Sequence, residues 1–274
     1  DLSPRIYYAT NPSFTDLLDN VLRFHPTAGI NWWYIPNAFS FPLMNPNPAT
    51  DGGRSAILGL VELANAFTSD PAPVTYYQGM VHPDLNTDGG LGMGNRPGRN
   101  SWAKMINSNS GWPDWYLTGG NTMAHELGHN KGLRHMNCSG DESDGGSTDP
   151  NYPYPFPNCR LSGPGTDGMY GFDVLYNLWG LAAPTVLSND PTAASPNRAF
   201  PLMGYQRPRW ISDYEYCKLL PTYGVLIPCL SAAVAGAQEQ FEQAVMADPL
   251  AYADPAKLAA LQAASRYLLA GGVL

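Results

Sequence analysis

The chain has 274 residues, of which 44% are hydrophobic and only 14% are charged, so it is too apolar for a disordered protein and long enough to bury a sizeable core. Its 15 Lys and Arg residues against 23 Asp and Glu residues give a net charge of −8, which argues against nucleic acid or an anionic membrane surface as the main partner. No stretch approaches the roughly 20 apolar residues that a transmembrane helix needs, so a membrane protein is not expected.

The first half of the chain alternates between strand and helix patterns. Strands are predicted at residues 5–9, 30–35 and 74–77, where aromatic and β-branched side chains gather. Helices are predicted from Ser13, whose hydroxyl can cap the first turn, and over residues 55–67, because apolar side chains recur there at helical spacing. This order predicts a mixed sheet backed by helices.

Residues 89–98 form a glycine-rich segment, GGLGMGNRPG. The segment lacks both the G-x-G-x-x-G spacing and the Lys-Ser/Thr pair of a phosphate-binding loop, so nucleotide binding is rejected. Glycine has no side chain in the way of a second backbone, which can therefore approach closely. The segment is predicted to be an edge strand.

The most informative segment is HELGHNKGLRH at residues 125–135. On a helix, His125 and His129 lie one turn apart on the same face, so both imidazoles can reach one ion at the about 2.0–2.1 Å that zinc prefers. Glu126 follows the first histidine, where it can take a proton from a water at the metal without being a ligand itself. This arrangement predicts one catalytic Zn²⁺ ion with a general base beside it.

The third histidine of the segment, His135, needs a break in the helix. If the helix continued, His135 would lie about 9 Å further along the axis than His129, too far to share the ion. Gly132 can adopt the left-handed conformation that ends a helix and turns the chain back. Three neutral imidazoles would leave the fourth position to water, as in catalytic zinc sites. The alternative is a helix whose histidines are in the core or in solvent, which is also the role predicted for His25 and His82.

The full pattern H-E-x-x-H-x-x-G-x-x-H at residues 125–135 resembles the signature of the metzincin clan of zinc metalloendopeptidases, and residues 210–214, WISDY, resemble the secreted bacterial members. The resemblance implies an α+β, zincin-like catalytic domain with a twisted mixed β-sheet, an active-site helix, an irregular lower subdomain and C-terminal helices. The upper subdomain is expected at residues 1–132, the lower subdomain at 133–230, and a helical extension at 231–274.

The resemblance also implies a Met-turn beneath the zinc. Met169 and Met203 are the candidates, and Met203 is favoured because Tyr205 follows it by two positions, as in the Met-x-Tyr turn of astacins and serralysins. By the same resemblance, Tyr205 stabilises the tetrahedral intermediate, whereas the alternative is a packed core tyrosine. The interval between His135 and Met203 is longer than the family pattern, which predicts an insertion at the lower cleft.

Four cysteines form two local pairs without C-x-x-C spacing, which favours two short-loop disulfides, Cys138 with Cys159 and Cys217 with Cys229, over a thiolate metal site. The alternative is four buried free thiols. Disulfides are typical of oxidising compartments, so a secreted, extracellular protein is predicted. The acidic run at residues 141–146 offers oxygen ligands for Ca²⁺ but lacks the frame of a calcium-binding loop, which favours a solvated loop.

The last third of the chain shows helical patterns. A helix is predicted at residues 211–220, and two more at 233–246 and 255–269, where Ala, Gln, Glu and Leu dominate. The short apolar faces of the last two favour a packed extension over a membrane element. The alternative is the start of a linker to further domains.

These features together predict a zinc-dependent endopeptidase that acts as a monomer on extracellular proteins or glycoproteins. Two alternatives stay open. The first is a zinc-bearing glycoprotein-binding module that has lost catalysis, against which the intact Glu126 counts. The second is a zinc amidase that acts on a glycan or on the cell wall.

The sequence also suggests how a substrate would bind. An extended peptide is expected to pair through its backbone with the edge strand at Leu91, Gly92 and Met93. Arg207 and Arg209 would favour acidic substrate side chains if they face the cleft, but the sequence leaves their orientation open.

Overall fold

The computed structural model describes most of the first two thirds of the chain, in segments. The described residues are 11–27, 30–32, 46–68, 75–82, 85–105, 118–138, 148–155, 159–162, 169–173, 185–188 and 199–224. The predicted strand at residues 5–9, the acidic run at 141–146 and the helical extension at 231–274 lie outside them. Among the described residues, no helix is long and apolar enough to cross a membrane.

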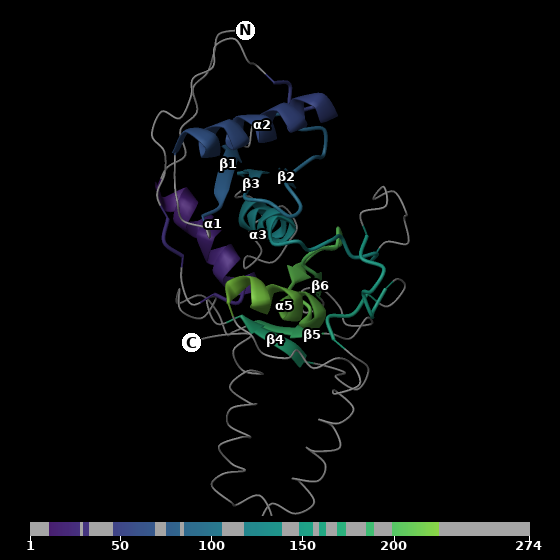
Figure 1. Cartoon of the computed structure of the whole chain (residues 1–274). Helices are drawn as coiled ribbons and strands as arrows, with labels where there is room; N and C mark the ends of the chain where they lie inside the picture. The colour runs from purple at the N-terminus through teal and green to yellow at the C-terminus, as the bar shows by residue number, and fades with distance from the viewer. Residues whose placement is uncertain are drawn as a thin grey trace, which may run out of the picture.

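The longer helices α1, α2 and α3 and the largest sheet among the described residues lie in the first half of the chain, and the described elements of the second half are short (Figure 1). The helices are α1 (Asn11–Phe24), α2 (Asp51–Thr68), α3 (Thr118–Asn130), α5 (Asp213–Leu219) and the 3₁₀-helix η2 (Leu220–Tyr223). The strands are β1 (Tyr77–Val81), β2 (Gly92–Gly94), β3 (Asn100–Lys104), β4 (Met169–Asp173), β5 (Thr185–Ser188), β6 (Phe200–Pro201) and β7 (Arg209–Trp210).

A three-stranded sheet lies between α2 and α3 (Figure 1). Its order is β1-β3-β2, with β1 parallel and β2 antiparallel to the central strand β3. Trp102 of β3 is fully buried, and its indole N–H donates a hydrogen bond of 3.2 Å to the carbonyl of Arg54 in α2. The glycine-rich segment therefore forms the edge strand β2, as predicted, and this edge faces α3.

The two predicted N-terminal helices are present, but both begin earlier than expected. The first begins at Asn11 rather than Ser13. The second begins at Asp51 because the hydroxyl of Thr50 accepts a hydrogen bond of 3.0 Å from the N–H of Gly53, three residues further on, and so caps the helix. The prediction at residues 55–67 included neither this cap nor the two glycines that follow it.

Two strand predictions differ from the structure. Residues 30–32 are described and are not in a strand, whereas residues 33–35 lie outside the described part. The strand predicted at residues 74–77 begins only at Tyr77 and continues to Val81. Its register follows from pairing with β3, which begins at Asn100 opposite Tyr77. A distant strand, rather than local β propensity, sets this start.

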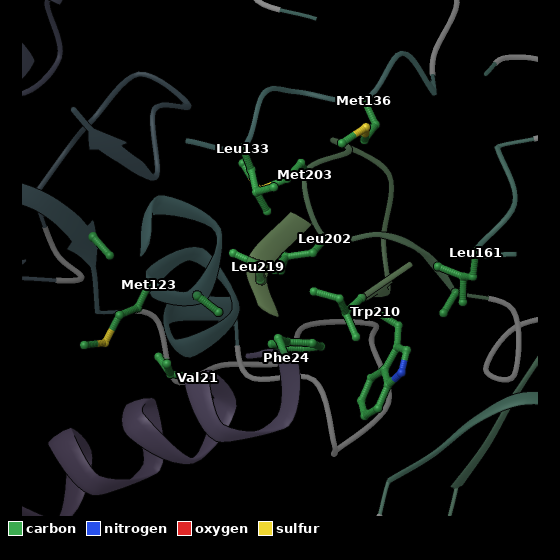
Figure 2. Packing of buried hydrophobic residues seen from close by; sticks show 14 of the residues in the cluster. Val21, Phe24, Met123, Leu133, Met136, Leu161, Leu202, Met203, Trp210 and Leu219 are labelled. Carbon is green, nitrogen blue, oxygen red and sulfur yellow. The ribbon is translucent and has the colours of Figure 1, made fainter. Parts of the chain in front are cut away.

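A second packing region joins α1 and α3 to the segment that follows residue 199 (Figure 2). Phe24 of α1 packs edge-on against Trp210 of β7, with ring centroids 5.3 Å apart. Each large side chain buried here stabilises the fold by about 1.5–3 kcal/mol. The region packs α3 against the segment that follows residue 199. Its fully buried members include Leu133, Leu161, Leu202, Met203 and Leu219.

The remaining strands form two small sheets. β4 and β5 pair in antiparallel fashion, and β6 and β7 pair in parallel. The predicted helix at residues 211–220 is present as α5 followed by η2. Ser212 caps α5 and forms a capping box with Glu215.

Candidate metal centre

The end of α3 has the geometry that the histidine pattern requires. His125 and His129 lie one turn apart in α3, which ends at Asn130. Gly132 has a φ of 92°, and the N–H of Leu133 donates to the carbonyl of Gly128 at 2.9 Å. This left-handed glycine ends the helix and reverses the chain, because a residue with a side chain would be strained at that φ.

The reversed chain brings His135 back to the helix. A short parallel bridge to Thr148 holds the backbone of His135, and the N–H of Asp149 donates to its carbonyl at 2.8 Å. The Nε2 atoms of His129 and His135 are 2.9 Å apart. One nitrogen from each of the three histidines lies within 4.8 Å of the others, so this cluster could hold a metal ion.

Hydrogen bonds of the imidazoles fix which nitrogen faces the centre of the cluster. The Nδ1 of His125 lies 2.8 Å from the carbonyl of Leu202, and the Nδ1 of His129 lies 2.9 Å from that of Leu133. A carbonyl oxygen can only accept, so both Nδ1 atoms must carry the proton. In a neutral ring this leaves Nε2 with a free lone pair, the form in which histidine binds a metal.

Burial keeps the three imidazoles neutral. It lowers the pKa of His125 well below its ordinary value, that of His129 to about 4 and that of His135 to about 3. Neighbouring positive groups, including Arg209, lower these pKa values further. The residues therefore fit a metal ion at neutral pH, because no proton has to be removed from any of them first.

Glu126 lies beside the histidines and is buried. Burial raises the pKa of its carboxyl to about 8, whereas the positive charge of Arg209 acts in the opposite direction. The strand β2 lies directly against it: a Cβ added to Gly92 would lie 2.6 Å from Oε1 of Glu126, and one added to Gly94 would lie 2.8 Å from its carbonyl oxygen. Only glycine allows the edge strand to come this close to α3.

A cleft of about 550 Å³ opens over the histidines and Glu126. The predicted substrate-binding residues Leu91, Gly92 and Met93 line one side of it, and Tyr205 lines another. The complete lining consists of Gly89, Gly90, Leu91, Gly92, Met93, Gly94, Arg96, Thr122, His125, Glu126, His129, His135, Tyr205, Arg207 and Arg209.

Tyr205 contacts the cluster from its open side. Its hydroxyl lies 3.2 Å from Nε2 of His135, and the centroids of the two rings are 4.9 Å apart. The side chain is 51% exposed, which does not fit the alternative of a packed core tyrosine. Tyr205 therefore stands at the mouth of the cleft, within reach of a bound molecule.

Met203 lies in the core beneath the centre, beside Leu133 (Figure 2). A Cβ on Gly128 would lie 2.7 Å from its sulfur, so the methionine packs directly on the helix that carries His125 and His129. Its carbonyl accepts a hydrogen bond of 3.0 Å from the N–H of Met136. Met169, the other candidate, lies in β4.

Glu215 was not identified from the sequence, although it organises this region. Its buried carboxylate accepts four hydrogen bonds, from the N–H groups of Leu202 at 3.1 Å, Met203 at 2.7 Å and Ser212 at 2.8 Å, and from the Ser212 hydroxyl at 2.8 Å. Burial raises the pKa of Glu215 to about 7, and the four donors oppose that rise. Through Leu202, Glu215 holds the carbonyl that orients His125.

The spacing Ser212-x-x-Glu215 is a capping-box pattern, which is the one signal in the sequence that marks Glu215. That pattern predicts a bond between the glutamate and the backbone of its own helix. It does not predict the two bonds to residues 202 and 203, because these depend on how the chain folds back.

The first predicted disulfide closes the segment that leaves the centre. Cys138, three residues after His135, is bonded to Cys159, with Cα atoms 5.1 Å apart. Cys217 is also disulfide-bonded, and its predicted partner Cys229 lies outside the described residues. The disulfides are compatible with an oxidising compartment.

Comparison of the chain with protein families, with curated proteins and with solved structures yields no match. The chemistry of the site therefore has to be argued from its own residues.

Proposed function

We propose that the chain is a zinc-dependent endopeptidase. One observation carries the proposal: three imidazoles bring one nitrogen each to within 4.8 Å of one another, and the buried carboxyl of Glu126, on the helix that carries two of them, lines the same open cleft. Three nitrogen ligands with an open fourth side are typical of catalytic zinc sites. His125, His129 and His135 would hold the ion.

When bound, zinc would lower the pKa of a water molecule and polarise the carbonyl of the scissile bond. Glu126 would accept the proton of the attacking water and return it to the leaving amine. Its position against β2 supports this role, because a peptide paired along the free edge of β2 would pass beside its carboxylate. The hydroxyl of Tyr205 would donate a hydrogen bond to the oxyanion that forms, and its contact with His135 at the mouth of the cleft supports this role.

The edge strand β2 would hold the substrate in extended form. Among the described strands, only β3 pairs with β2, so the backbone groups on the opposite side of β2 are available to a peptide. A peptide that pairs there becomes an additional strand, and its carbonyls pass over Glu126. This geometry supports a peptide substrate, in proteins or glycoproteins, over a glycan.

We further propose that the domain has the zincin-like α+β architecture of the metzincins and that it works outside the cell as a monomer. The sheet above α3, the chain reversal at Gly132 and the packing of Met203 beneath the centre support the first point. The disulfides support the location outside the cell.

The decisive experiment is the substitution Glu126→Gln with zinc content and casein hydrolysis measured together. We expect unchanged zinc content and a loss of turnover of at least about a hundredfold, because general-base catalysis contributes about 10²–10⁴-fold. The exposed Asp51 offers a matched control, since Asp51→Asn makes the same acid-to-amide change away from the cleft. Chelation of zinc should abolish activity in both the wild type and the control.

The same assay separates the alternatives. A protein that binds zinc and a mucin but cuts neither casein nor mucin would be a binding module. One that releases products from a glycan or cell-wall amide, and none from casein, would be an amidase. Full activity of Glu126→Gln would contradict the assignment of the general base.

A further inference from the structure

The cleft carries an excess of positive charge in an acidic chain. Its lining holds three arginines, Arg96, Arg207 and Arg209, and one carboxylate, Glu126, while the three histidines are neutral. With Glu126 ionised, as a general base has to be, the lining has a net charge of +2 before any metal ion is bound, whereas the whole chain has a net charge of −8. A bound cation would make the cleft more positive still.

The arginines approach the centre from two sides. Arg96 follows the edge strand β2, whereas Arg207 and Arg209 belong to the segment that enters β7. Both segments line the cleft together with His129 and His135. Positive charge thus reaches the cleft from two separate segments of the chain.

Arg207 and Arg209 differ in their access to solvent, and this difference distinguishes their roles. Arg209 is buried, so its charge acts through a medium that screens poorly and sets the potential of the cleft floor. Arg207 is half-buried and lines the cleft, so its guanidinium can bind a substrate group that loses its hydration on entering the cleft. A guanidinium binds a carboxylate through two parallel hydrogen bonds, which favours an acidic side chain over an amide of the same size.

We propose that this cleft selects peptides with an Asp or Glu side chain next to the scissile bond, and that Arg207 is the residue that determines this specificity. The inference rests on the proposed peptidase function and adds its substrate class. The anion recognised is a carboxylate on the peptide itself, rather than one on an attached glycan.

The test uses pairs of peptides that differ by Asp or Asn at a single position, placed in turn at each position around the scissile bond. We expect the wild type to prefer Asp by at least about tenfold in kcat/KM at one position, a factor that corresponds to about 1.4 kcal/mol. The preference should shrink as salt rises from about 0.05 to about 0.5 M, because Arg207 is partly exposed.

Variants at Arg207 assign the preference to this residue. Arg207→Gln should remove most of the Asp preference, and Arg207→Glu should reverse it in favour of Lys. Arg99 is exposed and does not line the cleft, so Arg99→Gln is the matched control and should keep the wild-type preference. Equal rates with Asp and Asn in the wild type, or an unchanged preference in both Arg207 variants, would overturn the inference.

Binding measurements distinguish this failure from a failure of the proposed function. If no peptide is cut, the fluorescence anisotropy of the same labelled peptides decides: tighter binding of the Asp peptide by about tenfold supports the specificity and refutes the peptidase, and equal binding refutes both. A glycopeptide whose only anion is a sialic acid completes the series. A preference for it, with none for Asp, would overturn the assignment to an acidic side chain.

Discussion

Replacement of Glu215 by Gln should damage the centre without touching a metal ligand. In the wild type, one carboxylate oxygen accepts from the N–H groups of Leu202 and Ser212 and from the Ser212 hydroxyl, while the other accepts from the N–H of Met203. An amide has one oxygen, so its NH₂ group would face at least one of these donors. That buried donor loses its partner, at a cost of about 1–3 kcal/mol, and the remaining bonds lose their charge assistance.

The total cost is about 3–5 kcal/mol, which for a domain of this size corresponds to a fall in Tm of about 10 °C. The segment at Leu202 should also loosen, and with it the hydrogen bond to His125, so metal affinity should fall about 10–100-fold. Differential scanning calorimetry and metal titration at about pH 8, above the pKa of Glu215, measure both effects.

Glu62 provides the control for this substitution. It is exposed and accepts one hydrogen bond, from the amide of Asn95, so Glu62→Gln should change Tm little. A Glu215→Gln variant with a Tm within about 2 °C of the wild type and with unchanged metal affinity would refute the reasoning, because it would show that the four hydrogen bonds contribute almost nothing.

Two further predictions concern the edge strand and the core. Gly92→Ala should lower kcat at least about tenfold at unchanged zinc content, because the new Cβ would lie 2.6 Å from the Glu126 carboxylate. Gly59→Ala is the control and should keep the wild-type kcat, because its new Cβ meets nothing within 4 Å. Equal kcat values in the two variants would count against the contact. His25 is buried with a pKa lowered from 6.5 to about 4 by burial, so the unfolded chain binds more protons and stability is lost as pH falls from about 6.5 to about 4. His25→Gln lacks this titration. As pH falls from about 6.5 to about 4, its free energy of unfolding, measured with urea, should therefore rise relative to that of the wild type by up to about 3 kcal/mol. A difference between the two proteins that stays constant with pH would contradict the assignment.

The local parts of the centre could be predicted from the sequence. The spacing of His125 and His129 and the glycine at position 132 determine a helix, its end and the reversal of the chain, and all three depend on backbone geometry within eleven residues. The edge strand could be predicted for the same reason, because its glycines mark a close backbone approach.

The parts that depend on distant contacts could not be predicted. The start of β1 depends on its pairing with a strand more than twenty residues away, whereas the start of α2 depends on the neighbouring Thr50, a local cap that the sequence does contain. The orientation of Arg207 towards the cleft follows from how the segment after residue 199 packs under α3. Side-chain periodicity contains no information about such contacts.

The hydrogen bond from His125 to the carbonyl of Leu202 spans 77 positions of the chain. A growing polypeptide that has been synthesised only as far as the third histidine contains the whole H-E-x-x-H-x-x-G-x-x-H pattern, yet nothing in it fixes the tautomer of the first. The missing carbonyl, and the carboxylate of Glu215 that positions it, are made later. Maturation of the centre is therefore coupled to completion of the domain, and an enzyme that cuts polypeptides would acquire its activity only after its own chain is folded.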